Sequence, residues 1–226
     1  MSPLISVIIP LYNAVKYVMD ALLSIQNQDY FPIEIIVVDD GSTDGGMDRI
    51  ESDSTVRFFR QDHQGPGYAR NTGVTNSRGD WLAFLDADDI WTPGKLSAQF
   101  RYLEDHPNQD MVFGQIEQFI SPDIPMEQHP FLPDNRHVMN GVHVGAMLIK
   151  RKSFDRVGLF RTDLKMGEFI AWYARSRELE LKSGILNQIV MRRRIHRDNL
   201  THREKQSQTD YLQVIKTVLD QRRSKK

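Results

Sequence analysis

Three carboxylates follow one apolar run of the chain, at Asp86, Asp88 and Asp89. Oxygen ligands of this kind suit Mg²⁺ or Mn²⁺, which proteins usually hold with one or two carboxylates together with the phosphates of a substrate. An EF-hand calcium loop is not supported, because Ile90 stands where such a loop needs an oxygen ligand. Aspartates after a strand also serve as helix caps or turn residues. The Asp86-Ala87-Asp88 spacing therefore leaves a metal site and a structural turn as alternatives.

Two further polar segments follow apolar runs. Pro10-Leu11-Tyr12-Asn13 comes after residues 4–9, and Asp39-Asp40-Gly41-Ser42 comes after residues 33–38. The Asp39 and Asp40 carboxylates have the chemistry to bind a ribose or the edge of a base; the alternative is that they only shape a turn. The glycines between residues 65 and 73 match neither a dinucleotide fingerprint nor a P-loop.

The elements that must position these side chains alternate strands with helices. Apolar, largely β-branched runs predict strands at 4–9, 33–38, 56–59 and 81–85. Helices are predicted between them, at 17–28, 43–50 and 65–76. This alternation indicates a parallel α/β sheet with right-handed crossovers. Because ligands bind outside the carboxyl ends of such strands, the three polar segments are expected at one edge of the sheet.

The second half of the chain is less regular. Strands are predicted at 111–116 and 185–194, an apolar run covers 142–149, and helices are predicted after residue 150 and over 169–177 and 209–218. Residues 121–140 contain four prolines and are predicted to form a long mobile loop.

Composition excludes several classes of site. The chain has 226 residues and no cysteine, so a disulfide scaffold, cysteine-ligated zinc, an iron–sulfur cluster and thiol catalysis are ruled out. The length predicts one compact domain, with at most an appendage. No apolar run approaches the length of a membrane span, and the residues after Met1 do not resemble a signal peptide, so a cytoplasmic protein is expected.

The net charge of −1 hides an asymmetry. Residues 190–226 carry 11 Lys and Arg against 4 Asp and Glu, a net charge of +7, and the rest of the chain carries −8. This basic tail has three open interpretations: a solvated helix packed on the body, a contact to the anionic diphosphate or to an anionic membrane surface, or part of a homodimer interface. Nucleic-acid binding is not expected, because the basic residues lack interleaved aromatics and the body is acidic.

Four motifs occur in a familiar order over residues 5–90: Val7-Ile8-Ile9-Pro10-Leu11-Tyr12-Asn13, Val37-Val38-Asp39-Asp40-Gly41-Ser42-Thr43-Asp44, Gly67-Tyr68-Ala69-Arg70-Asn71-Thr72-Gly73 and Phe84-Leu85-Asp86-Ala87-Asp88-Asp89. Together they closely resemble the family 2 glycosyltransferases of the GT-A fold. The resemblance continues more weakly to about residue 200, through Gly158-Leu159-Phe160, Gly167-Glu168 and Arg194-Ile195-His196.

The resemblance implies a metal-dependent transfer of a sugar from a nucleotide-diphosphate sugar, UDP-linked by preference, with inversion at the anomeric carbon. It implies roles for the residues that match the motifs. Pro10 and Tyr12 would line the base pocket, Asp39 and Asp40 would bind the base or ribose with Arg70 nearby, and Asp86 would face the ribose. Asp88 and His196 would hold Mn²⁺ or Mg²⁺.

The chain departs from the family pattern where a Gly-Glu-Asp motif usually supplies the general base. Gly167-Glu168-Phe169 puts a phenylalanine in the Asp position, and phenylalanine cannot accept a proton. Our hypothesis is that Glu168 is the base; the alternatives are another carboxylate such as Asp163, or a noncatalytic protein that kept the nucleotide-sugar or a partner site. A nucleotidyltransferase is a further rival, although the motif order fits it poorly.

The predicted architecture is therefore one α/β domain of the GT-A type, with a mostly parallel central sheet flanked by helices. A nucleotide-sugar-binding half covers residues 1–90, an acceptor half covers 91–200, and a basic helical extension covers 201–226. The 121–140 loop is the predicted acceptor lid. The acceptor itself, a glycan, a lipid-linked sugar, a natural product or a peptide, is not indicated by any residue.

Overall fold

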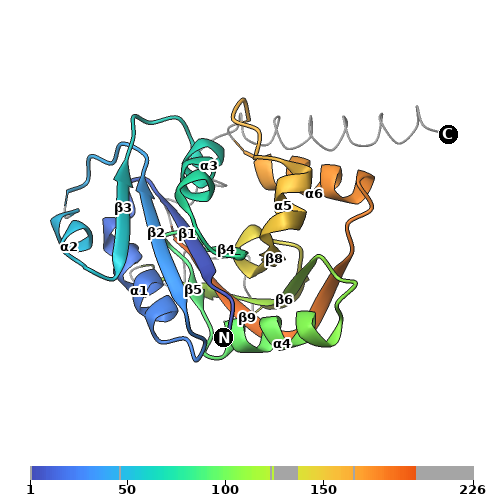
Figure 1. Ribbon diagram of the computed structural model, residues 1–226. Helices are drawn as coiled ribbons and strands as arrows, with labels where there is room; N and C mark the ends of the chain where they lie inside the picture. The colour runs from blue at the N-terminus through green and yellow to red at the C-terminus, as the bar shows by residue number, and fades with distance from the viewer. Residues whose placement is uncertain (1, 46, 123, 125–136, 165, 197–226) are drawn as a thin grey trace.

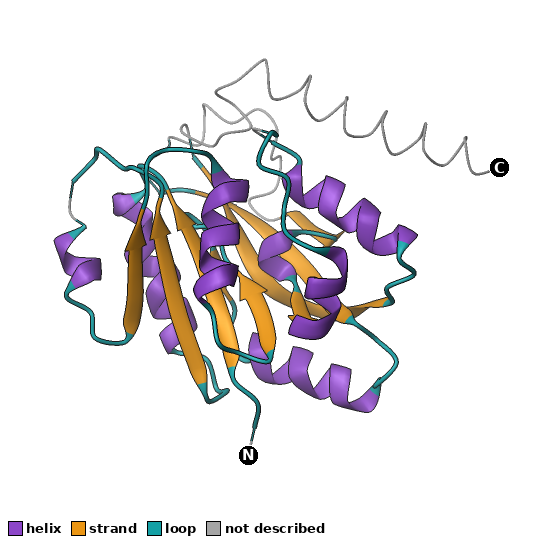
Figure 2. Ribbon diagram, turned by 45° about the horizontal axis from the view of Figure 1, so that its top comes forward, coloured by secondary structure: helices purple, strands orange, loops and turns teal. Residues whose placement is uncertain are grey.

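A mixed sheet of nine strands forms the frame of the protein in the computed structural model (Figure 1), which describes residues 2–45, 47–122, 124, 137–164 and 166–196. The strand order is β3-β2-β1-β4-β8-β6-β9-β5, and β7 pairs with β6 beside this path. Helices cover both faces of the sheet (Figure 2).

The first four strands are parallel neighbours, as the sequence predicts. They are β1 (Ile5–Leu11), β2 (Ile33–Asp39), β3 (Val56–Arg60) and β4 (Trp81–Phe84). Their connections contain α1 (Val15–Gln26), the single turn α2 (Asp48–Glu51) and α3 (Pro66–Asn76). The central strands β1 and β2 are mostly apolar, interrupted by Ser6 and Glu34, because both of their faces are covered.

The second half is mostly antiparallel. Its strands are β5 (Ile90–Trp91), β6 (Met111–Ile120), β7 (His137–Gly141), β8 (Leu148–Lys150) and β9 (Ser183–Ile195). Its helices are α4 (Lys95–Asp105), α5 (Arg151–Val157) and α6 (Glu168–Glu178), with a 3₁₀ turn, η2, at Val144–Ala146. Only the β6–β9 pair is parallel here, so the described sheet has four parallel and four antiparallel pairings.

The sequence prediction of an α/β sheet flanked by helices is confirmed, with two corrections. The sheet is mostly parallel only in its first half, since the chain returns through β8 and β6 without full crossovers. The prediction of a loop over 121–140 is wrong at its end, because residues 137–140 form most of β7 and pair with β6. Residues 125–136 of that loop and the predicted 201–226 extension lie outside the described residues.

Two hydrophobic cores lie on opposite faces of the sheet. The first packs α1 and α4 onto one face, through residues such as Leu22 and Leu96. The second packs α3, α5 and α6 onto the other, through residues such as Phe154 and Trp172. Within the described part of the chain, no helix is both long enough and apolar enough to cross a membrane.

Candidate active site

The polar segments that follow β1, β2 and β4 meet at one edge of the sheet. Parallel pairing puts the carboxyl ends of the three strands side by side. Backbone bonds continue this alignment past the strand ends, because Asp40 N donates to Leu11 O at 2.8 Å and Leu85 N donates to Ile8 O at 3.1 Å. The predicted convergence of Tyr12, Asp39 and the Asp86 segment is therefore present.

Asp88 and His196 lie in contact, although 108 residues separate them. The distance between His196 Nε2 and Asp88 Oδ2 is 2.8 Å. The antiparallel β5–β9 pairing, with Ile90 opposite Arg192, brings the end of β9 beside the Asp88 turn. The neighbouring Asp89 is buried, and burial together with the charges of Asp88 and Asp86 raises the pKa of its carboxyl well above the usual value.

The Asp88 carboxylate and the His196 imidazole form a donor set that fits Mn²⁺ or Mg²⁺. Among the residues that the structure describes, no group of three His, Cys, Asp or Glu side chains is arranged to hold a metal ion. A cation held here would therefore take its remaining ligands from water or from a substrate. Mg²⁺ sites of this kind commonly combine one or two carboxylates with substrate phosphates.

Arg70 lies buried between two carboxylates. Its guanidinium donates to Asp86 Oδ1 at 2.5 Å and forms an ion pair with Glu168 Oε1. Burial is the largest single influence on the pKa of Asp86 and raises it, but the charge and hydrogen bond of Arg70 together with the charges of His143 and Arg193 hold the Asp86 pKa below its ordinary value. Arg70 Nε has no hydrogen-bond partner among the described residues, so one donor of a fixed guanidinium stays available.

Glu168 begins α6 and is only 7% exposed. Its carboxylate faces Arg70 rather than solvent, which is the position of an arginine anchor and not that of an open proton acceptor. Phe169 packs among Phe113, Trp172 and Tyr173 in the second core, so the position that usually carries the base is part of the hydrophobic interior.

Asp163, the alternative base of the sequence analysis, lies on the surface. Its side chain is 62% exposed and pairs with Arg161. Hydrogen bonds from Arg161 lower the pKa of the Asp163 carboxyl, which makes it a weaker proton acceptor. In this structure both carboxylates suggested from the sequence are therefore paired with an arginine, Glu168 with Arg70 and Asp163 with Arg161.

Asp40 is engaged by the loop that follows β3. Its carboxylate accepts hydrogen bonds from Gln61 Nε2 at 2.7 Å, Gln64 N at 2.9 Å and Gly65 N at 2.8 Å. His63 Nδ1 lies 2.9 Å from its second oxygen. A base or ribose would therefore have to compete with these four protein groups for the Asp40 carboxylate. The geometry favours a role for Asp40 in holding this loop.

Asp39 differs from its neighbour because one carboxylate oxygen lacks a hydrogen bond. Oδ1 accepts from Ser42 N at 2.9 Å, whereas Oδ2 is buried without a hydrogen-bond partner in the described structure and lies 3.4 Å from Arg60 Nε. A buried acceptor of this kind is costly unless a donor reaches it. Asp39 Oδ2 thus keeps unused acceptor capacity beside Arg60, in a side chain that is fully buried in this structure.

Tyr12 stacks on His63, with ring centroids 3.9 Å apart and planes at 20°. Tyr12 is 45% exposed, so the stack has an open aromatic face. Pro10 is half-buried within β1, opposite Val38 of β2. It therefore belongs to the strand that leads to Tyr12 and not to the exposed Tyr12–His63 stack. Sequence reasoning missed His63, since nothing in the residues 61–65 marks it as a partner of Tyr12 and Asp40.

His143 was also missed, because a lone histidine before an apolar run carries no signal. Its Nδ1 accepts from Gly145 N at 3.1 Å, and Trp91 Nε1 holds the same turn by donating to Gly145 O at 2.8 Å. Burial lowers the pKa of His143 to about 4, while the nearby Asp86 charge opposes that shift. The neutral ring therefore carries its hydrogen on Nε2.

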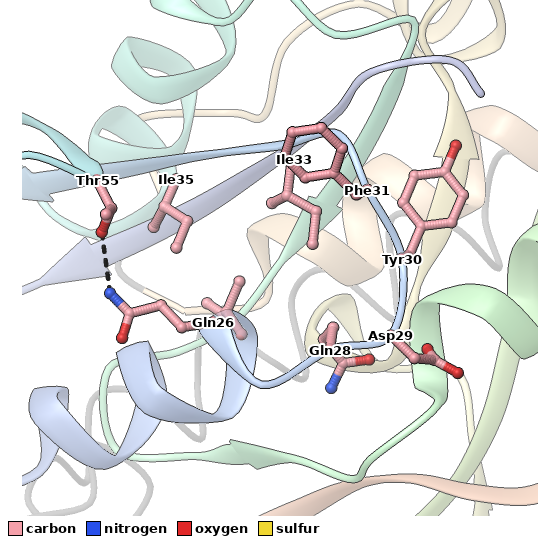
Figure 3. Close-up of a pocket in the computed structure, with 9 residues that line it drawn as sticks. Gln26, Gln28, Asp29, Tyr30, Phe31, Ile33, Ile35 and Thr55 are labelled. Atoms are coloured by element: carbon pink, nitrogen blue, oxygen red, sulfur yellow. Dashed lines mark hydrogen bonds between the residues drawn. The ribbon is translucent and has the colours of Figure 1, made fainter. Parts of the chain in front are cut away.

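A surface groove of about 660 Å³ lies at the other end of the parallel strands (Figure 3). The end of α1 and the start of β2 line it, and Gln26 bridges it by donating to Thr55 at 2.9 Å. Phe31 at its rim is 82% exposed. The carboxylates described above follow the carboxyl ends of the strands, so this groove is not part of their site.

Carboxylates, a histidine and a buried arginine thus gather at the carboxyl ends of the strands, which is where α/β sheets bind their ligands. The family model described as Glycosyl transferase family 2 matches residues 6–161. An uncharacterized glycosyltransferase of Rickettsia felis is 32% identical over 176 residues, covering 72% of this chain. The chain belongs to the family 2 glycosyltransferases.

Solved structures confirm the GT-A fold. S. aureus TarS 1–349 in complex with UDP-GlcNAc matches with a TM-score of 0.74 and 21% identity, covering 95% of this chain and 65% of that one. The mannosyltransferase PcManGT from Pyrobaculum calidifontis, in complex with GDP-Man and Mn²⁺, matches with a TM-score of 0.67 and 19% identity, covering 88% and 59%. The chain spans only 29% of the length of the Rickettsia felis relative.

Proposed function

We propose that this chain transfers a sugar from a nucleotide-diphosphate sugar, UDP-linked by preference, to an acceptor hydroxyl or similar nucleophile, with a divalent cation and with inversion. The observation that carries the proposal is the meeting of the Asp88–His196 pair with the Asp86–Arg70–Glu168 chain at one sheet edge. The complexes of TarS with UDP-GlcNAc and of PcManGT with GDP-Man and Mn²⁺ support it by analogy of fold.

The donor end of the site is assigned to the first half of the chain. Asp39 Oδ2 accepts an N–H of the base, and the exposed face of Tyr12 stacks on the base. Asp86 accepts from the ribose while Arg70 holds its carboxylate ionised and in place. Asp40 supports the base pocket by holding the 61–65 loop, and Pro10 supports it as part of the strand that leads to Tyr12.

The diphosphate end is assigned to Asp88 and His196, which would hold Mn²⁺ or Mg²⁺. A divalent cation bound there would stabilise the negative charge that develops on the leaving diphosphate. Asp88 and His196 fix its place relative to the base pocket, because the Asp88 turn and Asp86 belong to the same segment.

Glu168 is the predicted proton acceptor. The Glu168 base hypothesis requires that the Arg70 ion pair open when the substrates bind. We assign Glu168 first to anchoring Arg70, and its role as base stays a prediction. The acceptor molecule, the lid role of the 121–140 segment, the role of the basic tail and a cytoplasmic location likewise stay predictions.

A thermal-shift panel of UDP, UDP-GlcNAc, UDP-glucose and GDP-mannose, each with and without Mn²⁺, tests the donor site. A true donor at 100 times its Kd should stabilise the protein by about 2.7 kcal/mol. Asp88→Asn should lose the Mn²⁺-dependent part of the shift, whereas Asp105→Asn, at the exposed end of α4, should keep it. If no nucleotide diphosphate or sugar nucleotide stabilises the protein, the donor-site proposal fails.

The buried Phe169 favours one competing function, a noncatalytic protein that binds a nucleotide sugar. A noncatalytic protein should show the same donor-dependent thermal shift. It should neither hydrolyse the donor nor transfer the sugar to any member of an acceptor panel. Release of UDP from UDP-GlcNAc, measured by a coupled assay, separates the two functions, because even slow hydrolysis requires a working leaving-group site.

A further inference from the structure

Arg194 links the end of β9 to the Asp88 turn at two points. Its Nε donates to the Asp88 carbonyl oxygen at 3.0 Å, and its backbone N donates to Asp89 Oδ1 at 2.9 Å. His196 lies two residues further on and contacts Asp88 Oδ2. Arg194, near the end of β9, and His196, just beyond it, therefore both contact the Asp88 turn.

The guanidinium of Arg194 is buried but has its own counter-ion on α1. Its side chain is 6% exposed, and it pairs with Asp20 at 2.7 Å. It also stacks between the rings of Tyr17 and Phe119, each at 4.9 Å. The Tyr17 ring further contacts His196, with centroids 4.6 Å apart. One aromatic ring of α1 therefore orients both β9 side chains.

We propose that Arg194, held by Asp20 and Tyr17, is a positioning residue that sets the Asp88–His196 pair for the divalent cation. Its contact to Asp88 runs through the main-chain carbonyl, so it fixes the turn while Asp20 offsets its charge. The inference rests on the proposed function, since it concerns the cation of that same site. It adds α1 to the elements that determine cation affinity, although α1 carries no proposed metal ligand.

Arg192 is a matched control on the same strand. It also stacks on Phe119, at 4.5 Å, and it also pairs with a carboxylate, Glu117, at 2.7 Å. Its side chain is 39% exposed, and its ion pair joins β9 to β6 instead of to the Asp88 turn. A general effect of removing an arginine from β9 would therefore appear in both variants.

The test measures Mn²⁺ affinity by electron paramagnetic resonance in the presence of UDP, and UDP affinity without metal by calorimetry, on the full chain. Arg194→Gln is expected to weaken Mn²⁺ binding about 10-fold or more, as loss of an outer-shell partner does, while UDP affinity without metal stays within about twofold. Arg192→Gln should leave both affinities within about twofold of wild type.

Two further variants guard against a folding defect. Arg194→Lys keeps the charge opposite Asp20 but lacks the planar Nε donor, so it should also weaken Mn²⁺ binding. Asp20→Asn changes a residue whose side chain is 54% exposed, and it should weaken Mn²⁺ binding several-fold because Arg194 loses its tether. Circular dichroism melts show which variants are folded.

The inference is overturned if folded Arg194→Gln or Arg194→Lys binds Mn²⁺ as wild type does, or if Arg192→Gln weakens it equally. It is also overturned if UDP affinity without metal falls as much as Mn²⁺ affinity. Wild-type protein that binds neither UDP nor Mn²⁺ with UDP would remove the proposed function and this inference together. If the wild-type protein binds UDP and Mn²⁺ and Arg194→Gln binds Mn²⁺ equally well, only this inference is removed.

Discussion

Glu168 and Phe169 are adjacent at the start of α6 but lie in opposite surroundings. Glu168 faces the buried guanidinium of Arg70, and Phe169 packs into an aromatic cluster of the second core. Successive residues of a helix point about 100° apart, which separates the two side chains, and Phe169 has no carboxylate, so this segment delivers only the Glu168 carboxylate to the site. Sequence reasoning identified the missing Asp but not the partner that occupies Glu168.

Glu168→Gln should remove the charge that holds Arg70. We expect a loss of about 1–3 kcal/mol in the free energy of unfolding, because Arg70 keeps Asp86 as its remaining partner. Asp163→Asn, at the exposed Arg161 pair, should cost about 0–1 kcal/mol. Urea titrations give the stabilities.

The same two variants examine the base hypothesis through turnover. A base at Glu168 requires that Glu168→Gln lose transfer while it still binds UDP; an anchor requires that donor affinity fall as well. Unchanged turnover in Glu168→Gln would exclude the base, and unchanged turnover together with unchanged donor affinity would exclude both roles.

His143 should make stability depend on pH. Its folded pKa is about 4 and its ordinary value is about 6.5, so between these values the unfolded chain binds a proton that the folded chain does not. The stability that neutral His143 allows is therefore complete above pH 6.5 and decreases as the pH falls towards 4, by about 2–3 kcal/mol.

His143→Gln should flatten this part of the stability profile, measured by urea unfolding at several pH values. His106→Gln, at the exposed end of α4, is the control and should keep the slope. A wild-type slope that survives in His143→Gln would show that another group causes it.

At the scale of elements, α3 positions Arg70 by packing unusually close to its neighbours. A Cβ atom on Gly67 would lie 2.6 Å from the Arg161 carbonyl oxygen, and one on Gly73 would lie 2.4 Å from Ile8 Cγ2. The helix has almost no amphipathic apolar stripe. Its contact face is made of small residues instead, and these let it approach the sheet and the loop before α6. The glycines that the sequence motif contains are thus explained by helix contact and not by phosphate binding.

Gly67→Ala should push α3 away from the Arg161 backbone, which cannot yield as a flexible side chain would. We expect a loss of about 1–3 kcal/mol in stability and weaker donor binding, because Arg70 moves with the helix. Thr75→Ala, on the exposed side of α3, should change neither. Urea unfolding and the UDP thermal shift provide the measurements; donor affinity equal to wild type in folded Gly67→Ala would contradict the expectation.

At the scale of the molecule, the two predicted halves share their cores and one sheet. The first core joins Ile5 and Leu22 to Val190 and Met191, and β4 pairs directly with β8 across the halves. The site also combines residues of both halves, since Asp88 comes from one half and His196 from the other. The binding edge therefore exists only when both halves are folded together.

Urea unfolding should accordingly show a single transition in which far-UV circular dichroism and tryptophan fluorescence coincide. Trp81 lies at the start of β4 in the first half and Trp172 lies on α6 in the second, so the fluorescence reports on both. A fragment of residues 1–90 should not fold alone, because β4 would lose its β8 neighbour. Two separated transitions would show that the halves are independent domains.

The sequence alone determined the parallel strands β1 to β4, the polar segments at their ends and the family, and through the family resemblance it predicted Asp88 and His196 as metal ligands. The strands follow from short apolar runs and the family from ordered motifs, and both kinds of pattern are formed by residues close together along the chain. Only the tertiary structure decided that Asp40 is used by a loop, that Glu168 is paired with Arg70, and that Arg194 joins the Asp88 turn. Those contacts depend on side-chain burial and on the antiparallel return of β9, which bring together residues up to 174 positions apart, such as Asp20 and Arg194, and which no local pattern encodes.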